Sequence, residues 1–436
     1  MKYYPTYKDS NINWAMSIPA TWKVQKIKYG LLFRQGGAWG TDPADNEFDC
    51  PCIRVADFDY AHLCVLDREY TVRNYSTAQI EKLTLSYGDL LIEKSGGGET
   101  TPVGRVVIYD KKSPALYANF LEALRVKENQ SSSFYKYIFS TLFSIGINRL
   151  YFNQTTGIQN LNVGRYIGEK IPIPPLEQQN SIALYLDEKT AEIDDLISQK
   201  TMLVNLLREK RTSAISTAVT KGIDSTAEMK DSGNEWLGYI PSHWRVVPAK
   251  ALFAQSKETR HETDVQLTAS QKYGIISQED YMEKQSYKIV LADKGLENWK
   301  HVEPNDFIIS LRSFQGGLEI SYIPGCITWH YIVLKPKAGV EPEYFKWLFK
   351  SPRYIQALQR TANFIRDGQD LRFSNFVQVP LPLIPMDEQK EIAEYLNKET
   401  ARIDSIIADI TEQIEKLKEY RQSVISEVVT GKVAVE

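Results

Sequence analysis

The sequence predicts an α+β fold in which two globular domains of mixed α/β structure are linked by two long helices. The main observation is an internal repeat, because residues 175–220 match residues 385–430 at a constant offset of 210 without a gap. A shorter pattern precedes each copy, since that of residues 14–24 returns at residues 236–246. With 43% hydrophobic and 25% charged residues, the composition is that of a globular protein with enough apolar mass for two cores.

The repeat divides the chain into two homologous halves. Each half has about 200 residues, which fits a globular domain of roughly 150 residues followed by a helix. Two equal halves in one chain are expected to be related by a pseudo-two-fold axis, which makes the helices antiparallel. The predicted segments are a first domain at 1–174, a central helix at 175–222, a second domain at 223–384 and a C-terminal helix at 385–436.

Within each domain, a short apolar strand precedes a polar loop. The strands are predicted at residues 89–92 and 306–309, and the loops at residues 94–101 and 312–317. Each loop contains a basic side chain, a serine and glycines, which can contact a phosphate through side chain and backbone amide alike. The same composition is typical of an ordinary turn, so both interpretations stand at this point. Late helices are predicted to open at residues 135–139 and 344–348.

The two repeated segments carry the start and stop signals of helices. Each begins after a proline, has acidic residues in its first turn and ends at a glycine, Gly222 or Gly431. Apolar residues recur at spacings of three and four, which is the narrow stripe of a coiled-coil seam, so the two helices are predicted to pair. The stripe comprises Ile193, Leu196, Leu203 and Leu207 in the first helix and Ile403, Ile406, Ile410, Leu417 and Val424 in the second.

The cysteine content favours a reducing cytoplasm, because four cysteines are too few for a disulfide framework in 436 residues. No run of ~18 apolar residues and no signal-peptide core are found, so no membrane contact is expected. Alternate residues on a strand share a face, so Cys50 and Cys52 could converge on zinc. His62 and Cys64 could complete the set, but this spacing is not a common zinc pattern. Residues 53–58 instead predict a plain strand, and no metal is expected.

The charge pattern both opposes and allows nucleic-acid binding. A net charge of −3 is an objection, because affinity for nucleic acids rests largely on phosphate neutralisation. Local clusters of basic side chains can still neutralise phosphates, and amide side chains near them suit hydrogen bonding to base edges. Residues 380–436, with seven basic and twelve acidic groups, suit a protein partner instead. The clusters comprise Lys94, Arg105, Lys111, Lys112 and Arg125 in the first half and Arg353, Arg360, Arg366 and Arg372 in the second.

The residues at each helix entry carry the most specific pattern. Residues 171–179, Ile-Pro-Ile-Pro-Pro-Leu-Glu-Gln-Gln, return as residues 379–389, Val-Pro-Leu-Pro-Leu-Ile-Pro-Met-Asp-Glu-Gln. Ile-Pro-x-x-Trp stands at residues 18–22 and again at residues 240–244. On these motifs the whole chain resembles the specificity (S) subunits of type I restriction–modification enzymes.

The resemblance implies a reader of double-stranded DNA rather than a catalyst. Each domain would be a target-recognition domain that reads one half of a bipartite, asymmetric target, and the helices would set the distance between the halves. Two methyltransferase (M) subunits would dock on the chain, with restriction (R) subunits in the full complex. S-adenosylmethionine is expected in the partner methyltransferase, and no cofactor in this chain. Residues 385–436 are the expected docking element, and their removal is expected to leave the first domain folded.

The candidate DNA-binding residues combine the two loops with the basic and amide side chains near them. Guanidinium and amide groups are the side chains that read base edges. The candidates are Lys94, Ser95, Gly96, Arg105, Asn153, Gln154 and Gln159 in the first domain and Arg312, Ser313, Gln315, Arg366 and Gln369 in the second.

Sequence motifs of catalysis are not found. The chain has no phosphate-binding loop, no Asn-Pro-Pro-aromatic methylase motif and no convincing nuclease core. Five histidines are scattered without metal or triad spacing, and His330 fits a packed strand residue better than a catalyst. Two rival functions remain, a fused methylase or nuclease with degenerate motifs and a coiled-coil adaptor without DNA contact.

Overall fold

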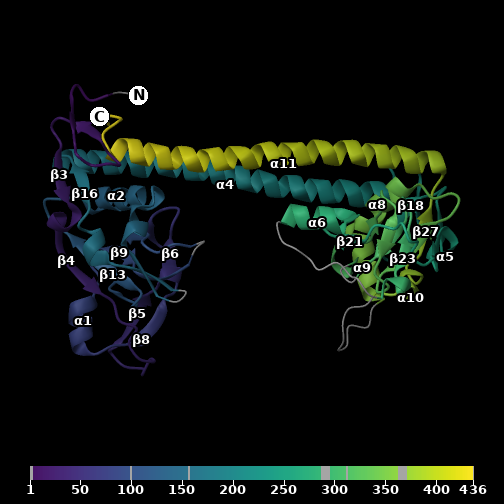
Figure 1. Ribbon diagram of the computed structural model, residues 1–436, viewed down its shortest axis with the longest axis horizontal. Helices are drawn as coiled ribbons and strands as arrows, with labels where there is room; N and C mark the ends of the chain where they lie inside the picture. The colour runs from purple at the N-terminus through teal and green to yellow at the C-terminus, as the bar shows by residue number, and fades with distance from the viewer. Residues whose placement is uncertain are drawn as a thin grey trace. The chain divides into compact units, whose positions relative to one another are not determined.

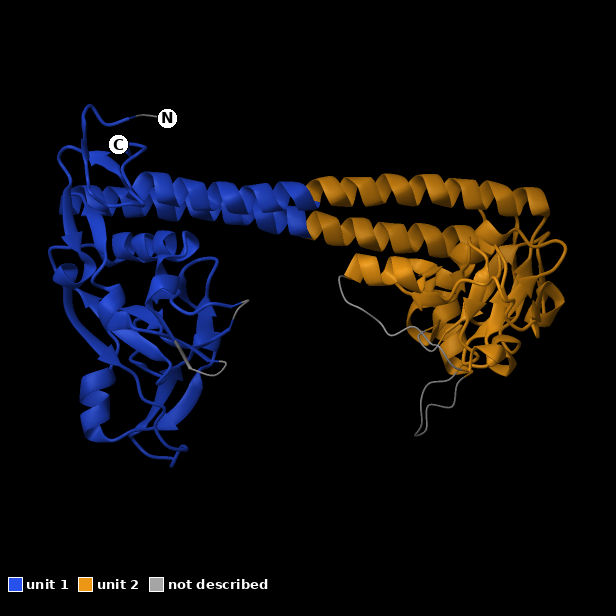
Figure 2. Cartoon of the chain, viewed as in Figure 1, with its two compact units in different colours: residues 1–201, 411–436 blue, residues 202–410 orange. Residues whose placement is uncertain are grey.

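The chain folds into two compact units, each of which contains one globular domain. The structure is a computed structural model that describes residues 3–98, 101–155, 158–285, 295–310, 313–361 and 371–435. Unit 1 comprises residues 1–201 and 411–436, and unit 2 comprises residues 202–410 (Figure 2). The division falls within both long helices, so each unit also contains part of each helix. The four-segment division stays a prediction.

Unit 1 is built on a six-stranded sheet of order β4-β13-β9-β11-β7-β6 (Figure 1). On β9, Leu90 and Ile92 enter a core that contains helix α2, whereas Leu91 enters a second core with the sheet β12-β5-β8. Both faces of β9 are therefore buried, which explains the uninterrupted apolar run of the predicted strand. The bounds are β4 Leu31–Gly36, β5 Asp49–Ile53, β6 Phe58–Asp59, β7 Cys64–Val65, β8 Thr71–Asn74, β9 Leu90–Glu93, β11 Val106–Ile108, β12 Leu116–Tyr117, β13 Leu121–Val126 and α2 Ser132–Ser144.

Unit 2 repeats this principle with a smaller sheet of order β20-β27-β24-β25. On β24, Phe307 and Ile309 enter a core with helices α8 and α9, whereas Ile308 enters a second core with β21 and β26. The strands predicted at residues 89–92 and 306–309 and the late helix predicted in each domain are thus confirmed. The bounds are β20 Phe253–Gln255, β21 Leu267–Ser270, β22 Gly274–Ser277, β23 Lys300–Val302, β24 Phe307–Ile309, β25 Glu319–Ile320, β26 Gly325–Ile327, β27 Ile332–Pro336, α8 Pro342–Lys350 and α9 Pro352–Arg360.

The repeated opening motif lies against the start of the helix that follows its domain. In unit 1 the buried Trp22 donates its indole N–H to Gln178 at 2.9 Å, and in unit 2 Trp244 donates to Glu388 at 3.0 Å. Gln178 and Glu388 are equivalent at the offset of 210. The strands that bring each motif to its helix are β1 Tyr7–Asp9, β2 Ser17–Pro19, β3 Lys23–Lys26 and β16 Lys170–Ile173 in unit 1, and β17 Met229–Asp231, β18 Tyr239–Pro241, β19 Arg245–Val247 and β28 Leu381–Leu383 in unit 2.

A buried glutamine in the first turn of each long helix joins that helix to its domain. The Gln179 carbonyl accepts the N–H of Ser131, the residue that precedes α2, at 2.9 Å. In the second copy, Gln389 accepts the N–H of Glu341, which precedes α8, at 2.8 Å. Because each bond satisfies a backbone donor at a helix start, the glutamine in the repeated motif has the same structural role in both units.

Both long helices are confirmed, and each ends close to its predicted glycine. Helix α4 spans Leu176–Lys221 and α11 spans Met386–Val429, so residues 430–435, which were predicted as helix, leave it. Gly431 explains the stop, because its φ is +75° and a Cβ there would meet Pro19 at 2.4 Å. The shorter helices are η1 Ile27–Gly30, α1 Thr77–Leu83, η3 Ile147–Tyr151, α3 Val163–Tyr166, α5 Ala249–Leu252, α6 Gln278–Gln285, η4 Leu296–Asn298, α7 Ser313–Gly316 and α10 Phe373–Phe376.

The apolar stripe on the long helices differs from the predicted one at three positions. Leu196, Leu203 and Ile406 are 41%, 45% and 36% exposed, so their assignment to the seam is wrong. Val204 and Ile414, which were not predicted, are buried. Of the remaining predicted residues, Ile193, Ile403, Ile410 and Val424 are buried, and Leu207 and Leu417 are half-buried.

One ion pair between the two helices is found at equivalent positions in both units. In unit 1, Asp194 of α4 pairs with Arg421 of α11 at 2.9 Å. In unit 2, Arg211 of α4 pairs with Asp404 of α11, also at 2.9 Å. The two aspartates are equivalent at the offset of 210, and so are the two arginines. Each helix therefore contributes the acid to one pair and the base to the other, as expected for antiparallel copies of one sequence.

The end of α11 is part of the core of unit 1. Val424, Ile425 and Val428 are buried in the same cluster as Trp22. This contradicts the expectation that the first domain folds normally without residues 385–436, because the deletion would remove part of its core.

Residues 53–58 do not form the single strand that was predicted. Strand β5 ends at Ile53, and a 3-10 turn spans Val55–Asp57. The buried Asp57 carboxylate accepts the Arg54 N–H at 2.7 Å and pairs with Arg68. The acid thus caps a turn within an otherwise apolar segment, which the strand pattern did not take into account.

Candidate nucleic-acid interface

In unit 1, two polar segments that the sequence predicted separately lie in one small sheet. Strand β10, Ser95–Gly97, pairs antiparallel with β15, Ile158–Leu161, which pairs in turn with β14, Phe152–Thr155. The register places Asn160 opposite both Ser95 and Asn153. The predicted loop at 94–101 is therefore partly wrong, because its centre is a strand.

The exposed part of this sheet offers hydrogen-bonding groups. Asn153 and Gly96 are exposed, and Ser95 donates its hydroxyl to the Asn160 side chain at 2.5 Å. Gly96 has a φ of +104°, and a Cβ there would lie 3.4 Å from the ring of Phe120, which is itself exposed. A two-stranded ribbon fits the major groove of DNA, and amides read its base edges. The geometry is thus suited to reading DNA.

Two further amide residues, Gln154 and Gln159, lie opposite each other on β14 and β15. Gln159 is buried, and its side-chain oxygen has no hydrogen-bond partner among the described residues. The side chain of Gln154, which lies on β14 opposite Gln159, falls outside the described residues.

The predicted basic cluster of unit 1 is largely paired internally. Arg105 pairs with the buried Glu93 at 3.2 Å and lies 3.7 Å from the centroid of the Tyr60 ring. Arg125 pairs in the same way with the buried Asp89 at 2.6 Å. The charge of these two arginines therefore compensates carboxylates that the fold buries, which the sequence pattern did not indicate.

The lysines of that cluster are divided. Lys111 pairs with Asp110 at 3.3 Å. Lys94 is half-buried and Lys112 is exposed, and neither has an ion pair within the described part of the chain. Lys94 continues directly into β10, so it is the cation of the cluster that adjoins the small polar sheet.

In unit 2, fewer of the predicted residues can be placed. Arg312, Arg366 and Gln369 lie outside the described residues. Ser313 is buried, and its hydroxyl accepts the Ser310 N–H at 2.8 Å. It is the first residue of helix α7, where a loop was predicted. Gln315 is exposed on that helix. Of the basic cluster, Arg353 and Arg372 are exposed, and Arg360 pairs with Glu235 at 2.7 Å.

Gln315 lines a groove of about 660 Å³ that the sequence did not reveal. Gln271, Lys272 and Tyr273, which form the turn between β21 and β22, also line it, together with Trp347. The Lys272 ammonium lies 4.9 Å from the centroid of the Tyr273 ring. Aromatic, basic and amide groups in one groove suit nucleic acids. A lysine and a tyrosine at the turn of a hairpin were the sequence signal that could have found this surface.

The cysteines and histidine that were weighed as zinc ligands and set aside are placed as follows. Cys50 and Cys52 lie on β5 and Cys64 on β7, while His62 pairs with Asp59 at 2.7 Å. No three of the described histidine, cysteine and acidic side chains around these thiols come close enough for a metal site. Burial raises the pKa of all three thiols. They therefore behave as small apolar side chains.

Two expectations about the histidines are wrong. His330 lies in an exposed turn, stacked on Trp329 at 3.5 Å, and not within a packed strand. His261 and His301, distant in sequence, are stacked in space with ring centroids 3.9 Å apart.

A family model described as the type I restriction modification DNA specificity domain matches the chain twice, over residues 46–205 and 241–416. The MjaX specificity subunit of Methanocaldococcus jannaschii is 23% identical, covering 99% of this chain and 98% of its own length. The EcoKI specificity subunit of Escherichia coli is 19% identical, covering 97% of this chain and 91% of its own length.

Solved structures show the same fold. The HsdS subunit from Thermoanaerobacter tengcongensis is 13% identical and superimposes with a TM-score of 0.56, covering 95% of this chain and 98% of its own. A chain from a study of assembly and conformational transition in the type I R-M system gives a TM-score of 0.65 at 14% identity, covering 95% and 99%. Within the described residues, no helix has the length and apolar character needed to cross a bilayer.

Proposed function

The chain belongs to the type I restriction modification DNA specificity family, and from that premise we propose how its two halves share the work of a specificity subunit. Each globular domain reads one half of a bipartite, asymmetric DNA target. The two long helices set the spacing between the half-sites and dock the partner subunits. The chain itself carries out no catalytic step.

One observation carries this proposal: the two halves share their framework and differ in their polar surfaces. The tryptophan, glutamine and ion-pair contacts occur at equivalent positions in both units. The candidate reading elements are not equivalent, because unit 1 offers the β10-β15-β14 sheet and unit 2 the groove lined by Gln315. A constant framework with unlike polar surfaces suits two readers of unlike half-sites.

The proposed partners are two methyltransferase subunits on the helices, with restriction subunits joining the full complex in the cytoplasm. S-adenosylmethionine would bind in the methyltransferase. Support comes from apolar side chains that the helix pair leaves on its surface, since Met202, Leu203 and Leu206 of α4 are all about half exposed or more. Exposed apolar groups gathered over one or two helical turns are typical of a protein interface.

A docking test follows from these three residues. Replacing Leu203 and Leu206 by Glu should prevent co-purification with a methyltransferase subunit while the melting temperature of the free chain is unchanged, because neither residue is in a core. The control is the pair Glu209→Gln and Lys210→Gln on the same helix. Normal assembly of the glutamate variant would contradict docking at this surface.

The reading role is tested by exchanging residues 223–384 for the second domain of another family member. The methylated positions of a host genome that carries the chain and its methyltransferase should then change in one half of the target only. The matched control exchanges residues 1–174 and should change the other half. A change in both halves, or a continuous methylated motif, would show that the domains do not read independently.

A further inference from the structure

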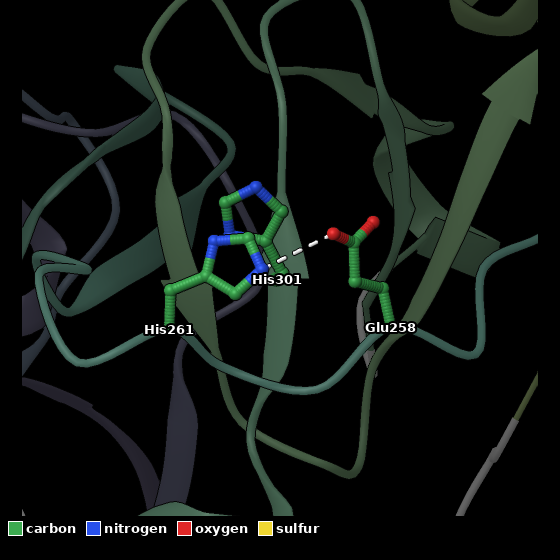
Figure 3. Close-up of side chains that lie close together, drawn as sticks. All are labelled: Glu258, His261 and His301. Carbon is green, nitrogen blue, oxygen red and sulfur yellow. Dashed lines mark ion pairs between the residues drawn. The ribbon is translucent and has the colours of Figure 1, made fainter.

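Three potential metal ligands converge in unit 2, away from the candidate reading groove. One ligand atom from each of Glu258, His261 and His301 lies within 4.8 Å of the others (Figure 3). His301 belongs to β23, whereas Glu258 and His261 belong to the segment between β20 and β21. The cluster is therefore made by folding, which is why five dispersed histidines gave no sequence signal.

Backbone hydrogen bonds hold the two segments that carry these side chains next to each other. The Glu258 carbonyl accepts the N–H of His301 at 3.1 Å, and Arg260 donates its N–H to the Trp299 carbonyl at 2.8 Å. These bonds hold the segment alongside β23. His301 is almost fully buried, while Glu258 and His261 are exposed and can adjust.

Only a small adjustment would bring the ligands to metal-binding distances. Tetrahedral bonds of about 2.0–2.1 Å place neighbouring ligand atoms about 3.3 Å apart. His261 Nε2 is already 3.2 Å from a Glu258 oxygen. The remaining contraction, from at most 4.8 Å, needs rotation of the exposed side chains rather than movement of the sheet.

The surroundings supply the outer contacts that metal-bound histidines need. His301 Nδ1 is 2.8 Å from the buried Asp264 carboxylate, and His301 Nε2 is 2.8 Å from Glu303. Both ring nitrogens therefore donate protons to carboxylates. If a cation displaces one of these protons, the other nitrogen keeps its carboxylate, which is the usual way a metal-bound imidazole is oriented.

The charge around the cluster favours a cation. Besides Glu258, Asp264 and Glu303, the buried Asp306 lies close by. The facing positive groups are Lys335, 3.4 Å from Glu258, and Arg260, which lies beside the Cys326 thiol. Four carboxylates thus face two fixed cations and the protonated His301 ring, which leaves an excess of negative charge.

We propose that Glu258, His261 and His301 bind one divalent transition-metal ion of the zinc class. Two imidazoles with a carboxylate favour zinc, nickel or cobalt over magnesium and calcium, which prefer sets of oxygen ligands. The ion ties the segment between β20 and β21 to β23 inside the second domain. It is a structural clamp on that domain, and the proposal holds whatever DNA the chain reads.

The test is a zinc titration of the full-length chain after removal of metal by a chelator. Competition with a chromophoric chelator should show one bound Zn²⁺ ion. Adding Zn²⁺ to the metal-free chain should raise the melting temperature of the chain. Mg²⁺ should have no such effect. His261→Ala should weaken the site by about tenfold or more, since even outer contacts of metal sites are worth 10- to 100-fold.

His243→Ala is the matched control. His243 is also 51% exposed and also pairs with a glutamate, Glu388, at 2.8 Å, but it lies outside the cluster. This variant should bind zinc as the unaltered chain does. Glu258→Gln provides a second variant within the cluster in case His261→Ala misfolds. No zinc binding, or equal affinity in the His261 and His243 variants, would overturn the proposal.

Discussion

At the scale of single residues, two of the ion pairs between α4 and α11 are equivalent in sequence and unlike in environment. The Asp194–Arg421 pair of unit 1 is only 15% and 13% exposed, whereas Asp404 and Arg211 of unit 2 are 53% and 33% exposed. Solvent screens the second pair, so the repeat provides an internal comparison of one interaction in two surroundings.

Asp194→Asn should therefore destabilise the chain more than Asp404→Asn. The first change weakens charge-assisted bonds in a largely enclosed site, worth about 1.5–3 kcal/mol. The second removes an exposed pair worth about 0–1 kcal/mol. Denaturant unfolding of the two variants measures the difference. Equal losses would show that the enclosed pair has no added strength.

Glu93 gives a pH-dependent prediction. Burial raises the pKa of its carboxyl above the ordinary 4.5, although Arg105 acts in the opposite direction. A raised pKa means that the folded chain binds the proton more tightly than the unfolded chain, so stability falls as the pH rises from about 4.5 through the raised pKa. Glu93→Gln removes this dependence.

The variant should therefore gain melting temperature relative to the unaltered chain as the pH increases through that interval. Melting curves measured across it, with the exposed Glu81→Gln as the control, test this. A difference that does not vary with pH would mean that the Glu93 carboxyl titrates alike in the folded and unfolded chain.

The surroundings of the basic residues could not be predicted from the sequence. Arg105 and Arg125 were assigned to a basic cluster, but the fold buries Glu93 and Asp89 beside them. Such ion pairs join residues that are far apart in the sequence. Neither the hydrophobic period nor the local spacing of residues can therefore predict them. The polar residues of β10 and of β14–β15 were each selected from local composition, and the sequence did not predict that these strands pair in one sheet.

At the scale of elements, the long helices were predictable and their seam only partly so. The caps are local and occur twice, which identifies both helices. The seam is ambiguous because apolar residues stand next to each other, as in Leu203-Val204 and Ile406-Ile407. Either member continues a spacing of three or four, and only the partner surface decides that Val204 is buried and Leu203 exposed.

This ambiguity gives a matched pair of substitutions on α11. Ile410 is buried, and Ile410→Asp should cost several kcal/mol, because it removes an apolar side chain and buries an unpaired charge. Ile406, one turn earlier, is exposed, and Ile406→Asp should change stability by about 0.5 kcal/mol or less. Melting temperatures compare the two. Similar losses would contradict the assigned seam.

At the scale of the whole molecule, each long helix belongs to both units. Helix α4 starts in unit 1 and ends in unit 2, and α11 does the reverse. Because the end of α11 packs around Trp22, deleting it tests folding and docking at the same time. Changes that alter helix length while keeping both ends are therefore more informative than truncations.

Inserting one heptad into α4 after Thr201 and one into α11 after Ile410 keeps the seam in phase in both helices. Seven residues add about 10 Å of helix, and each base pair rises about 3.4 Å. If the helices set the spacing, the unread spacer of the methylated target should lengthen by at most about three base pairs, with both half-sites unchanged. A heptad in α4 alone is the control, because it leaves the helices unequal and should abolish methylation. An altered half-site in the doubly extended chain would mean that the helices also shape the reading surfaces.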